Sequence, residues 1–168
     1  MADLLDTELD AILEGTSRSF YLSLKELPSG VRSQVGLLYL LARTSDTIAD
    51  SEQGSAESRL VALEHYNEYA QGHSDSLPDL SELARLQRID SERKLLERMS
   101  ATVACIDRFS DSDQLHIRHC LDVIVGGQML DLQRFSGTAE GKVVALSEDT
   151  ELDDYAYRVA GSVGEFWT

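Results

Sequence analysis

Arg43, Asp46 and Asp50 lie within two helical turns of a stretch that is otherwise rich in leucine, VGLLYLLARTSDTIAD. Two aspartates four residues apart project about 40° apart around a helix axis, so both carboxylates point the same way. Such a pair can hold Mg²⁺ through its oxygens while waters and a ligand phosphate complete the coordination shell. An arginine nearby suits phosphate oxygens, because its guanidinium donates paired hydrogen bonds. These three residues therefore predict a metal-dependent diphosphate site.

The spacing alone is weak evidence, because the chain carries 30 acidic residues among 168. Only one of the aspartate pairs emerges from a strongly apolar helix, where an unpaired charge is costly to bury. With Tyr39 and Arg43, that pair forms one polar stripe. The alternative interpretation is a solvated stripe with a surface ion pair between Arg43 and Asp46. Aspartates four residues apart occur at Asp6/Asp10, Asp46/Asp50, Asp75/Asp79, Asp107/Asp111 and Asp149/Asp153.

A second candidate stretch is TSRSFYLSL, which contains Ser17, Arg18, Ser19 and Phe20. Hydroxyls, a guanidinium and free backbone N–H groups at a helix start can together bind an anion. The alternative is ordinary helix capping beside core aromatic residues. The stretch predicts a phosphate contact only in combination with the aspartate pair.

Two further helical stretches carry candidate site residues. GGQMLDLQRF places Gln128 and Asp131 three residues apart, after two glycines that indicate close helix packing or room for a ligand. YAYRVAGSVGEF places Tyr155, Val159 and Val163 on one face. That face is either a tightly packed core helix or the wall of a cavity.

The elements that must position these residues are expected to be helices, because apolar residues recur with helical spacing along the chain. Gly15 is expected to stop the first helix, Thr16 and Ser17 to cap the second, and Thr150 with Asp153 to begin the last. The expected helices span residues 2–15, 17–27, 29–52, 56–70, 80–108 in one or two pieces with a cap at Asp90, 112–135 ending at Gly137, and 150–168. Residues 136–149 are expected to be irregular, with the one plausible short extended segment.

Composition restricts the possible functions. A formal net charge of −15 argues against a nucleic-acid surface, which needs clustered lysine and arginine. Cys105 and Cys120 lie in apolar helical stretches and are expected to be buried free thiols, which suits a reducing, cytoplasmic compartment. The acidic N-terminus does not resemble a signal peptide, and no apolar run reaches the roughly 18 residues of a membrane span. The sequence leaves room for peripheral membrane association.

Four stretches in this order, SRSFYLSLKELP, LLYLLARTSDTIAD, GGQMLDL and YAYRVAGSVGEF, resemble the squalene/phytoene synthase family. The resemblance runs from about residue 11 to Thr168. It implies an all-α, isoprenoid-synthase-type helical bundle around a central cavity. It also implies a head-to-head condensation of two allylic prenyl diphosphates, either farnesyl or geranylgeranyl diphosphate. Mg²⁺ is the implied cofactor, and NADPH is implied only if the product is of the squalene type.

The resemblance also implies roles for individual residues. Asp46 and Asp50 match the first aspartate-rich motif, which holds metal, and Arg43 would contact the same phosphates. Tyr155 matches a tyrosine that assists near the departing diphosphate, so these four are the expected catalytic residues. The expected substrate-binding residues are Ser17, Arg18, Ser19, Phe20, Tyr39, Gln128, Asp131, Val159 and Val163.

One departure from the family pattern is the second aspartate-rich motif, which none of the other aspartate pairs supplies. We therefore expect residues 1–168 to form a single helical domain, the N-terminal part of a synthase, and to be inactive alone. Exposed apolar surface at a truncated end would favour self-association. Two alternatives remain open: a non-catalytic acidic helical domain that binds a partner, and a related isoprenoid diphosphate cyclase.

Overall fold

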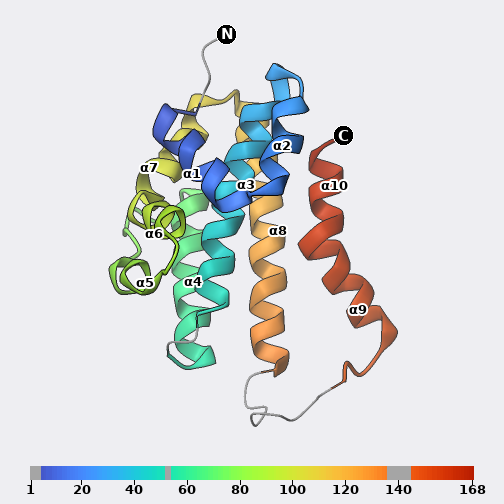
Figure 1. Ribbon diagram of the computed structural model, residues 1–168. Coiled ribbons are helices and arrows are strands. Elements are labelled where there is room, and N and C mark those ends of the chain that lie inside the picture. Colours follow the sequence, from blue (N-terminus) through green and yellow to red (C-terminus); the bar gives the residue numbers. More distant parts are fainter. Residues whose placement is uncertain (1–4, 52–53, 136–144) are drawn as a thin grey trace.

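The computed structural model describes residues 5–51, 54–135 and 145–168, and every regular element in these ranges is a helix (Figure 1). The predicted all-α fold class is therefore confirmed. The elements are α1 (Thr7–Ser17), α2 (Ser19–Glu26), α3 (Ser29–Ala49), α4 (Ala56–Gln71), α5 (Ser81–Leu86), α6 (Asp90–Glu97), α7 (Met99–Ala104), the 3₁₀ turn η1 (Cys105–Arg108), α8 (Asp111–Phe135), α9 (Asp149–Ala156), the π-helical segment η2 (Tyr157–Gly161) and α10 (Ser162–Phe166).

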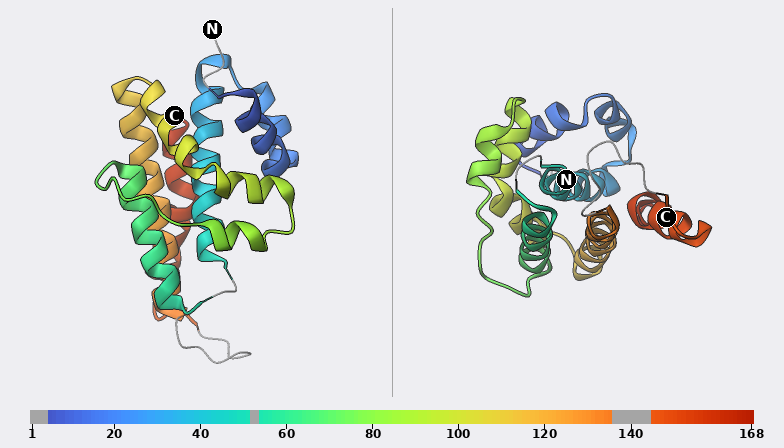
Figure 2. Two further views of the ribbon diagram at one scale, coloured as in Figure 1. Left: turned by 90° about the vertical axis from the view of Figure 1, so that its left-hand side faces the viewer. Right: turned by 90° about the horizontal axis from the view of Figure 1, so that it is seen from below.

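Three long helices, α3, α4 and α8, pack side by side and form the middle of the bundle (Figures 1 and 2). α3 contributes Leu37, Leu40 and Leu41 to the core, and none of the three is exposed to solvent. Tyr66 of α4 is also fully buried, and its hydroxyl donates a hydrogen bond of 2.9 Å to the Leu41 carbonyl. This central layer fixes the helix that carries the polar stripe.

The first helices cover one end of α3, and their boundaries differ from the prediction. Gly15 does not stop α1, which continues to Ser17. The glycine instead permits close packing on α6, because a Cβ there would lie 2.6 Å from the Ser91 Cβ. The hydroxyls of Thr16 and Ser17 donate to the carbonyls of Ile12 and Leu13, at 2.8 and 2.5 Å, so these two residues do not cap α2. The chain turns at Arg18, whose φ is 50°.

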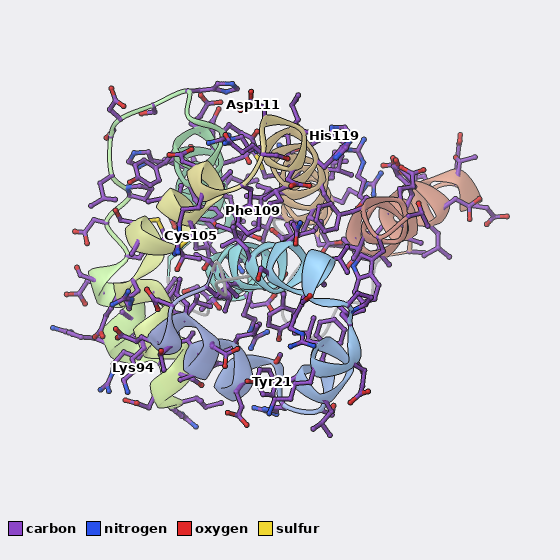
Figure 3. The ribbon with its side chains drawn as sticks, turned by 90° about the horizontal axis from the view of Figure 1, so that it is seen from above. Tyr21, Lys94, Cys105, Phe109, Asp111 and His119 are labelled. Carbon is purple, nitrogen blue, oxygen red and sulfur yellow. The ribbon has the colours of Figure 1, made fainter. Side chains whose placement is uncertain are left out.

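Side chains around the outside tie the peripheral helices together. Tyr21 on α2 lies beside α1, where its hydroxyl donates to Asp10 Oδ2 at 2.9 Å (Figure 3). Arg98, at the junction of α6 and α7, forms ion pairs with Asp6 at 3.2 Å and Glu8 at 2.5 Å. The two predicted free thiols, Cys105 and Cys120, are both buried and unbridged, as expected.

The last helical segment, α9–η2–α10, lies along α8 on the side away from α5 and α6 (Figures 1 and 2). It begins at Asp149 with a capping box between Glu148 and Glu151, so the predicted start at Thr150 and Asp153 is wrong. The Glu151 carboxylate accepts from the backbone N–H groups of Ser147 and Glu148, at 2.7 and 3.3 Å, so the capping box lies two residues earlier than predicted. A π-helical segment interrupts the helix at Tyr157–Gly161.

Other predicted boundaries are close to the observed ones. The structure divides the stretch predicted as one or two helices into α5, α6, α7 and η1. Asp90 is the first residue of α6, but Ile89 holds the N-cap position and no side chain caps the helix, so the predicted cap at Asp90 is wrong. The predicted helix over 29–52 ends at Ala49, and the predicted stop at Gly137 and most of the 136–149 segment lie outside the described residues. Within the described ranges, no helix combines the length and apolar character that crossing a bilayer requires.

Candidate functional site

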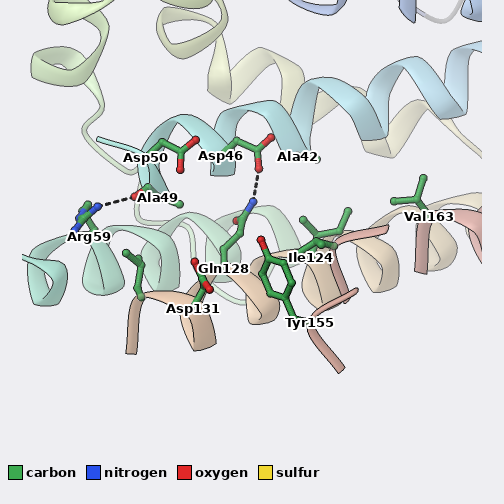
Figure 4. Close-up of a pocket in the computed structure, with 12 residues that line it drawn as sticks. Ala42, Asp46, Ala49, Asp50, Arg59, Ile124, Gln128, Asp131, Tyr155 and Val163 are labelled. Carbon is green, nitrogen blue, oxygen red and sulfur yellow. Dashed lines mark hydrogen bonds between the residues drawn. The ribbon is translucent and has the colours of Figure 1, made fainter. Parts of the chain in front are cut away.

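A cleft of about 480 Å³ lies where α3 faces α8 and the last helical segment (Figure 4). Asp46 and Asp50 come from one side of it, and Gln128, Asp131 and Tyr155 from the other. Both aspartates of the polar stripe therefore line one hollow, in which Asp46 is partly buried and Asp50 is exposed. The remaining lining residues are Ala42, Ala49, Arg59, Ile124, Leu132, Val159 and Val163.

Asp46 is held by a neighbouring helix. Its Oδ1 accepts a 2.5 Å hydrogen bond from Gln128 Nε2 on α8. Burial raises the pKa of the Asp46 carboxyl, and the nearby Asp50 charge raises it further, whereas Arg43 and the Gln128 bond oppose the shift. Two carboxylates on adjacent turns in a partly buried hollow repel one another, which favours the binding of a cation between them.

Tyr155 projects from α9 toward the same carboxylates (Figure 4). Its pKa is raised, first by burial and then by the negative charges of Asp131, Asp50 and Asp46. The phenol therefore keeps its proton at neutral pH and can donate a hydrogen bond to an anion in the cleft.

Close packing of α8 against η2 sets the position of Tyr155. A Cβ on Gly127 would lie 2.9 Å from Arg158 Cβ and 3.3 Å from Val159 Cγ1. The prediction of close packing at this glycine is therefore confirmed. Val159 and Val163 give the cleft an apolar wall beyond the tyrosine. An apolar wall next to carboxylates suits a ligand with a charged head and a hydrocarbon tail.

The carboxylates fit a magnesium ion that keeps part of its hydration shell. No group of three or more acidic, histidine or cysteine side chains in the described parts of the chain is arranged to hold a metal. Mg²⁺ commonly takes one or two carboxylates and completes its octahedron with waters and substrate phosphates. Asp46 and Asp50 match that requirement, so these two residues would hold the ion.

Arg43 lines a neighbouring cleft of about 570 Å³, between α3 and the α5–α6 region. Its Nη2 forms a 2.6 Å ion pair with Glu92 Oε1, and not the Asp46 surface pair of the alternative interpretation. Its Nε is buried without a hydrogen-bond partner among the described residues. Asp50 lines both clefts, so the cleft that Arg43 lines and the cleft that Asp46 lines adjoin at this residue. The role of Arg43 at phosphates stays a prediction.

The aromatic candidates meet at the other end of the polar stripe. The Phe20 ring lies 5.5 Å from the Tyr39 ring and 6.2 Å from the Trp167 ring, measured between centroids. Tyr39 donates to the Thr16 carbonyl at 3.0 Å. The pKa of Tyr39 is raised, chiefly by burial, and the positive charges of Arg43 and, to a smaller extent, Arg18 oppose the shift.

The predicted phosphate segment stands apart from the aspartate cleft. Ser17 is buried with its hydroxyl committed to Leu13, whereas Arg18 and Ser19 are exposed. Tyr39 and Asp50 are eleven residues apart on α3, which corresponds to about 16 Å along the helix axis. The structure therefore places the segment along the same helix face as the aspartates but not beside them.

Sequence reasoning missed two charged residues that the fold brings to the stripe. Glu92 pairs with Arg43 from 49 positions away. Arg59 lines the Asp46 cleft, and its Nη1 donates a 2.9 Å hydrogen bond to the Ala49 carbonyl. Neither residue belongs to a spacing pattern with the aspartates. The Arg43 guanidinium in an apolar helix was the one signal that called for a buried acidic partner.

A squalene/phytoene synthase family model matches residues 13–168 of the chain. The chain belongs to the squalene/phytoene synthase family. The resemblance drawn from its four motifs is thereby confirmed. The match includes every candidate site residue from Ser17 to Val163.

Two curated relatives carry the name bifunctional lycopene cyclase/phytoene synthase. The protein from Blakeslea trispora is 28% identical over 165 residues, which cover 94% of this chain and 24% of that protein. The protein from Neurospora crassa is 29% identical over 156 residues, which cover 89% of this chain and 25% of that protein. The chain therefore spans about a quarter of the length of these relatives.

Solved structures of TcSQS share the helical fold. The complex with the ligand E5700 superposes with a TM-score of 0.73 at 24% identity, covering 98% of this chain and 44% of that chain. The complex with the ligand BPH1237 gives a TM-score of 0.71 at 25% identity, covering 97% and 44%. These superpositions confirm the helical fold expected of the squalene/phytoene synthase family.

Proposed function

We propose that this chain supplies the diphosphate-binding part of a head-to-head prenyltransferase of the squalene or phytoene type. The observation that carries the proposal is the cleft in which Asp46, Asp50 and the protonated Tyr155 meet beside an apolar wall. Membership of the squalene/phytoene synthase family supports prenyl diphosphates as the substrate class.

In the proposed reaction, the allylic C–O bond of the first prenyl diphosphate breaks and diphosphate leaves with the electron pair. The double bond of the second molecule attacks the resulting allylic cation. Loss of a proton from the joined chain then gives a cyclopropylcarbinyl diphosphate. When bound, Mg²⁺ would neutralise the negative charge that develops on the leaving diphosphate.

The residues of the cleft have distinct parts in this proposal. Asp46 and Asp50 hold the metal, and the Tyr155 hydroxyl donates a hydrogen bond to the departing diphosphate. Val159, Val163 and Leu132 exclude water from the allylic cation, which would otherwise be captured by it. Arg43 and Arg18 are proposed to contact phosphate oxygens from farther along the stripe.

The proposal is tested by incubating the protein with Mg²⁺ and either farnesyl or geranylgeranyl diphosphate, with and without NADPH. Release of inorganic diphosphate and a C30 or C40 hydrocarbon product is the expected result for a longer form of the protein, whereas the 168-residue chain is expected to be inactive alone. The matched control is the Asp46→Asn, Asp50→Asn double variant, which keeps the shape of both side chains and removes their charge. The NADPH arm separates a squalene-type product from a phytoene-type product.

Because the chain spans a quarter of its curated relatives, the assay is run on the 168-residue chain and on any longer form of the protein that contains it. Diphosphate binding by the 168-residue chain is measured in parallel by calorimetry. Failure of both forms to release diphosphate, together with failure to bind it, would overturn the proposal. Binding that persists unchanged in the double variant would do the same.

A further inference from the structure

Gln128 of α8 is nine-tenths buried, with 9% of its surface exposed, and it lies between the two sides of the cleft (Figure 4). Its Nε2 donates the 2.5 Å bond to Asp46 Oδ1. Its Oε1 is also buried and has no hydrogen-bond partner in the described parts of the chain. One amide therefore has a donor end that is bonded to Asp46 and an acceptor end that is unused.

The donor end restricts how Asp46 can bind a cation. A carboxylate whose Oδ1 accepts from an amide N–H cannot rotate freely, and its Oδ2 keeps both lone-pair sites available for an ion. Carboxylates that ligate metals are commonly held in this manner by an outer hydrogen-bond partner. The bond also comes from a different helix, so it fixes Asp46 relative to α8 as well as to α3.

The acceptor end lacks a partner that buried amide oxygens ordinarily have. Waters bound to a divalent cation are strong hydrogen-bond donors, because the cation polarises their O–H bonds. A hydrated ion at Asp46 and Asp50 would bring such a donor into the cleft that Gln128 lines. The unused oxygen is therefore explained by a hydrated cation without any change in the protein.

We infer that Gln128 is a positioning residue for the metal site: its N–H holds Asp46 in a one-oxygen binding mode and its carbonyl accepts a hydrogen bond from a metal-bound water. The inference rests on the proposed function, because it requires the ion at Asp46 and Asp50. It goes further in assigning the outer contact to α8, a helix that carries neither aspartate of the pair.

The test measures metal binding without turnover. Mn²⁺ replaces Mg²⁺, and the free ion is counted by electron paramagnetic resonance during a titration of the 168-residue chain. Gln128→Met removes both ends of the amide at nearly the same side-chain length. The matched control is Gln114→Met on the same helix, about 21 Å away, whose amide bonds Phe109 and Arg118.

We expect Gln128→Met to weaken Mn²⁺ binding by about 10- to 100-fold and Gln114→Met to change it by less than about twofold. In an Asp46→Asn background, Gln128→Met should have a smaller effect, because only the contact with the metal-bound water remains to be lost. Thermal unfolding of the metal-free proteins is measured alongside. A merely structural glutamine would lower the melting temperature and leave the Mn²⁺ affinity of the folded chain unchanged.

Each outcome decides between the two proposals. If Asp46→Asn leaves Mn²⁺ binding unchanged, the metal site of the proposed function fails and this inference fails with it. If Asp46→Asn weakens binding and Gln128→Met does not, only the inference is overturned. Should Gln128→Met fail to fold, Gln128→Asn keeps the amide on a shorter stem that cannot reach Asp46, and the same loss of affinity is expected.

Discussion

The charged residues of one polar stripe have different partners in the two clefts that flank α3. On the α8 side, Asp46 and Asp50 face Gln128 and Tyr155, and the described cleft leaves the carboxylates without a cationic partner at bonding distance. On the α6 side, Arg43 is neutralised by Glu92 at 2.6 Å. The first cleft retains uncompensated negative charge, and the second is internally balanced.

This difference shows which part of the stripe is prepared for a ligand. The partly buried Asp46 carboxylate lies near the exposed Asp50 carboxylate, and a divalent cation would relieve their mutual repulsion on binding. An ion pair between Arg43 and Glu92 is already satisfied, so a phosphate must compete with Glu92 for the guanidinium. Glu92 is 14% exposed at its side chain and Arg43 34%, so solvent reaches the guanidinium for which phosphate and Glu92 compete.

The largest expected effect separates the two clefts by mutation. Asp46→Asn and Asp50→Asn should each weaken Mg²⁺-dependent pyrophosphate binding by on the order of 100-fold, because a direct ligand contributes at least as much as an outer partner. Arg43→Met should weaken the same binding by about 10-fold, since only a charge-assisted hydrogen bond is lost. Calorimetry with pyrophosphate in excess Mg²⁺ measures all three. An equal or larger loss for Arg43→Met would reverse the assignment of the two clefts.

A second prediction concerns the packing that places Tyr155 over the aspartates. Gly127→Ala puts a methyl group 2.9 Å from Arg158 Cβ, which cannot move without the π segment. The strain of about 1–3 kcal/mol should exceed the gain of about 1 kcal/mol from replacing glycine in a helix. Urea unfolding measures the net loss.

The adjacent glycine supplies the control for that packing prediction. Gly126→Ala meets only the far end of the Arg158 side chain, at 3.4 Å from Nη1. It should stabilise the protein by up to about 1 kcal/mol, because helix propensity improves and the arginine tip can give way. Equal effects of the two substitutions would mean that η2 adapts freely and does not fix Tyr155.

A third prediction tests whether the α6 side is independent of the α8 side. Glu92→Gln should lower the free energy of unfolding by about 1 kcal/mol, because the partly buried Arg43 keeps a hydrogen-bond acceptor but loses its counter-charge. Glu82→Gln, which breaks the exposed pair with Arg85, should have almost no effect. Pyrophosphate binding should tighten by less than about threefold in Glu92→Gln, because the neutral amide competes more weakly for Arg43 but still accepts its hydrogen bond. A tenfold change would show that Arg43 couples the clefts.

Much of this arrangement could be predicted from the sequence because it depends on spacing within single helices. The periodicity of α3 placed the two aspartates on one face, and that of α9 to α10 placed Tyr155 with two valines. The structure brings into one cleft seven of the predicted residues, Asp46, Asp50, Gln128, Asp131, Tyr155, Val159 and Val163.

What could not be predicted depends on contacts between different helices. The Arg43–Glu92 pair and the approach of Arg59 to Ala49 result from tertiary packing, which local spacing does not encode. The predicted end of the first helix was wrong for a related reason. Gly15 has the local character of a helix stop, but its lack of a side chain is used for contact with Ser91 in α6.

The smallest expected effect is a pH dependence of stability in the metal-free protein. The pKa of Asp46 is raised in the folded state, chiefly by burial, above its ordinary value of 3.8. The folded chain therefore binds this proton more readily than the unfolded chain, and the free energy of unfolding decreases as pH rises through the interval between the two pKa values. Asp46→Asn removes that penalty, so the variant should be more stable than the wild type at neutral pH, and the advantage should vanish below about pH 3.8.

Asp79 provides a control of opposite sign on the same protein. Its pKa is lowered because the Ser81 hydroxyl and backbone N–H donate to its carboxylate. Asp79→Asn should therefore destabilise the chain at neutral pH, and the difference should disappear as pH falls through the lowered pKa. Denaturant unfolding from pH 3 to 8 compares the three proteins. Saturating Mg²⁺ should make the wild type more stable to unfolding than Asp46→Asn, because only the wild type gains binding energy. If Mg²⁺ leaves that order unchanged, the repulsion at Asp46 is not relieved by a metal and the contrast between the two clefts has no functional meaning.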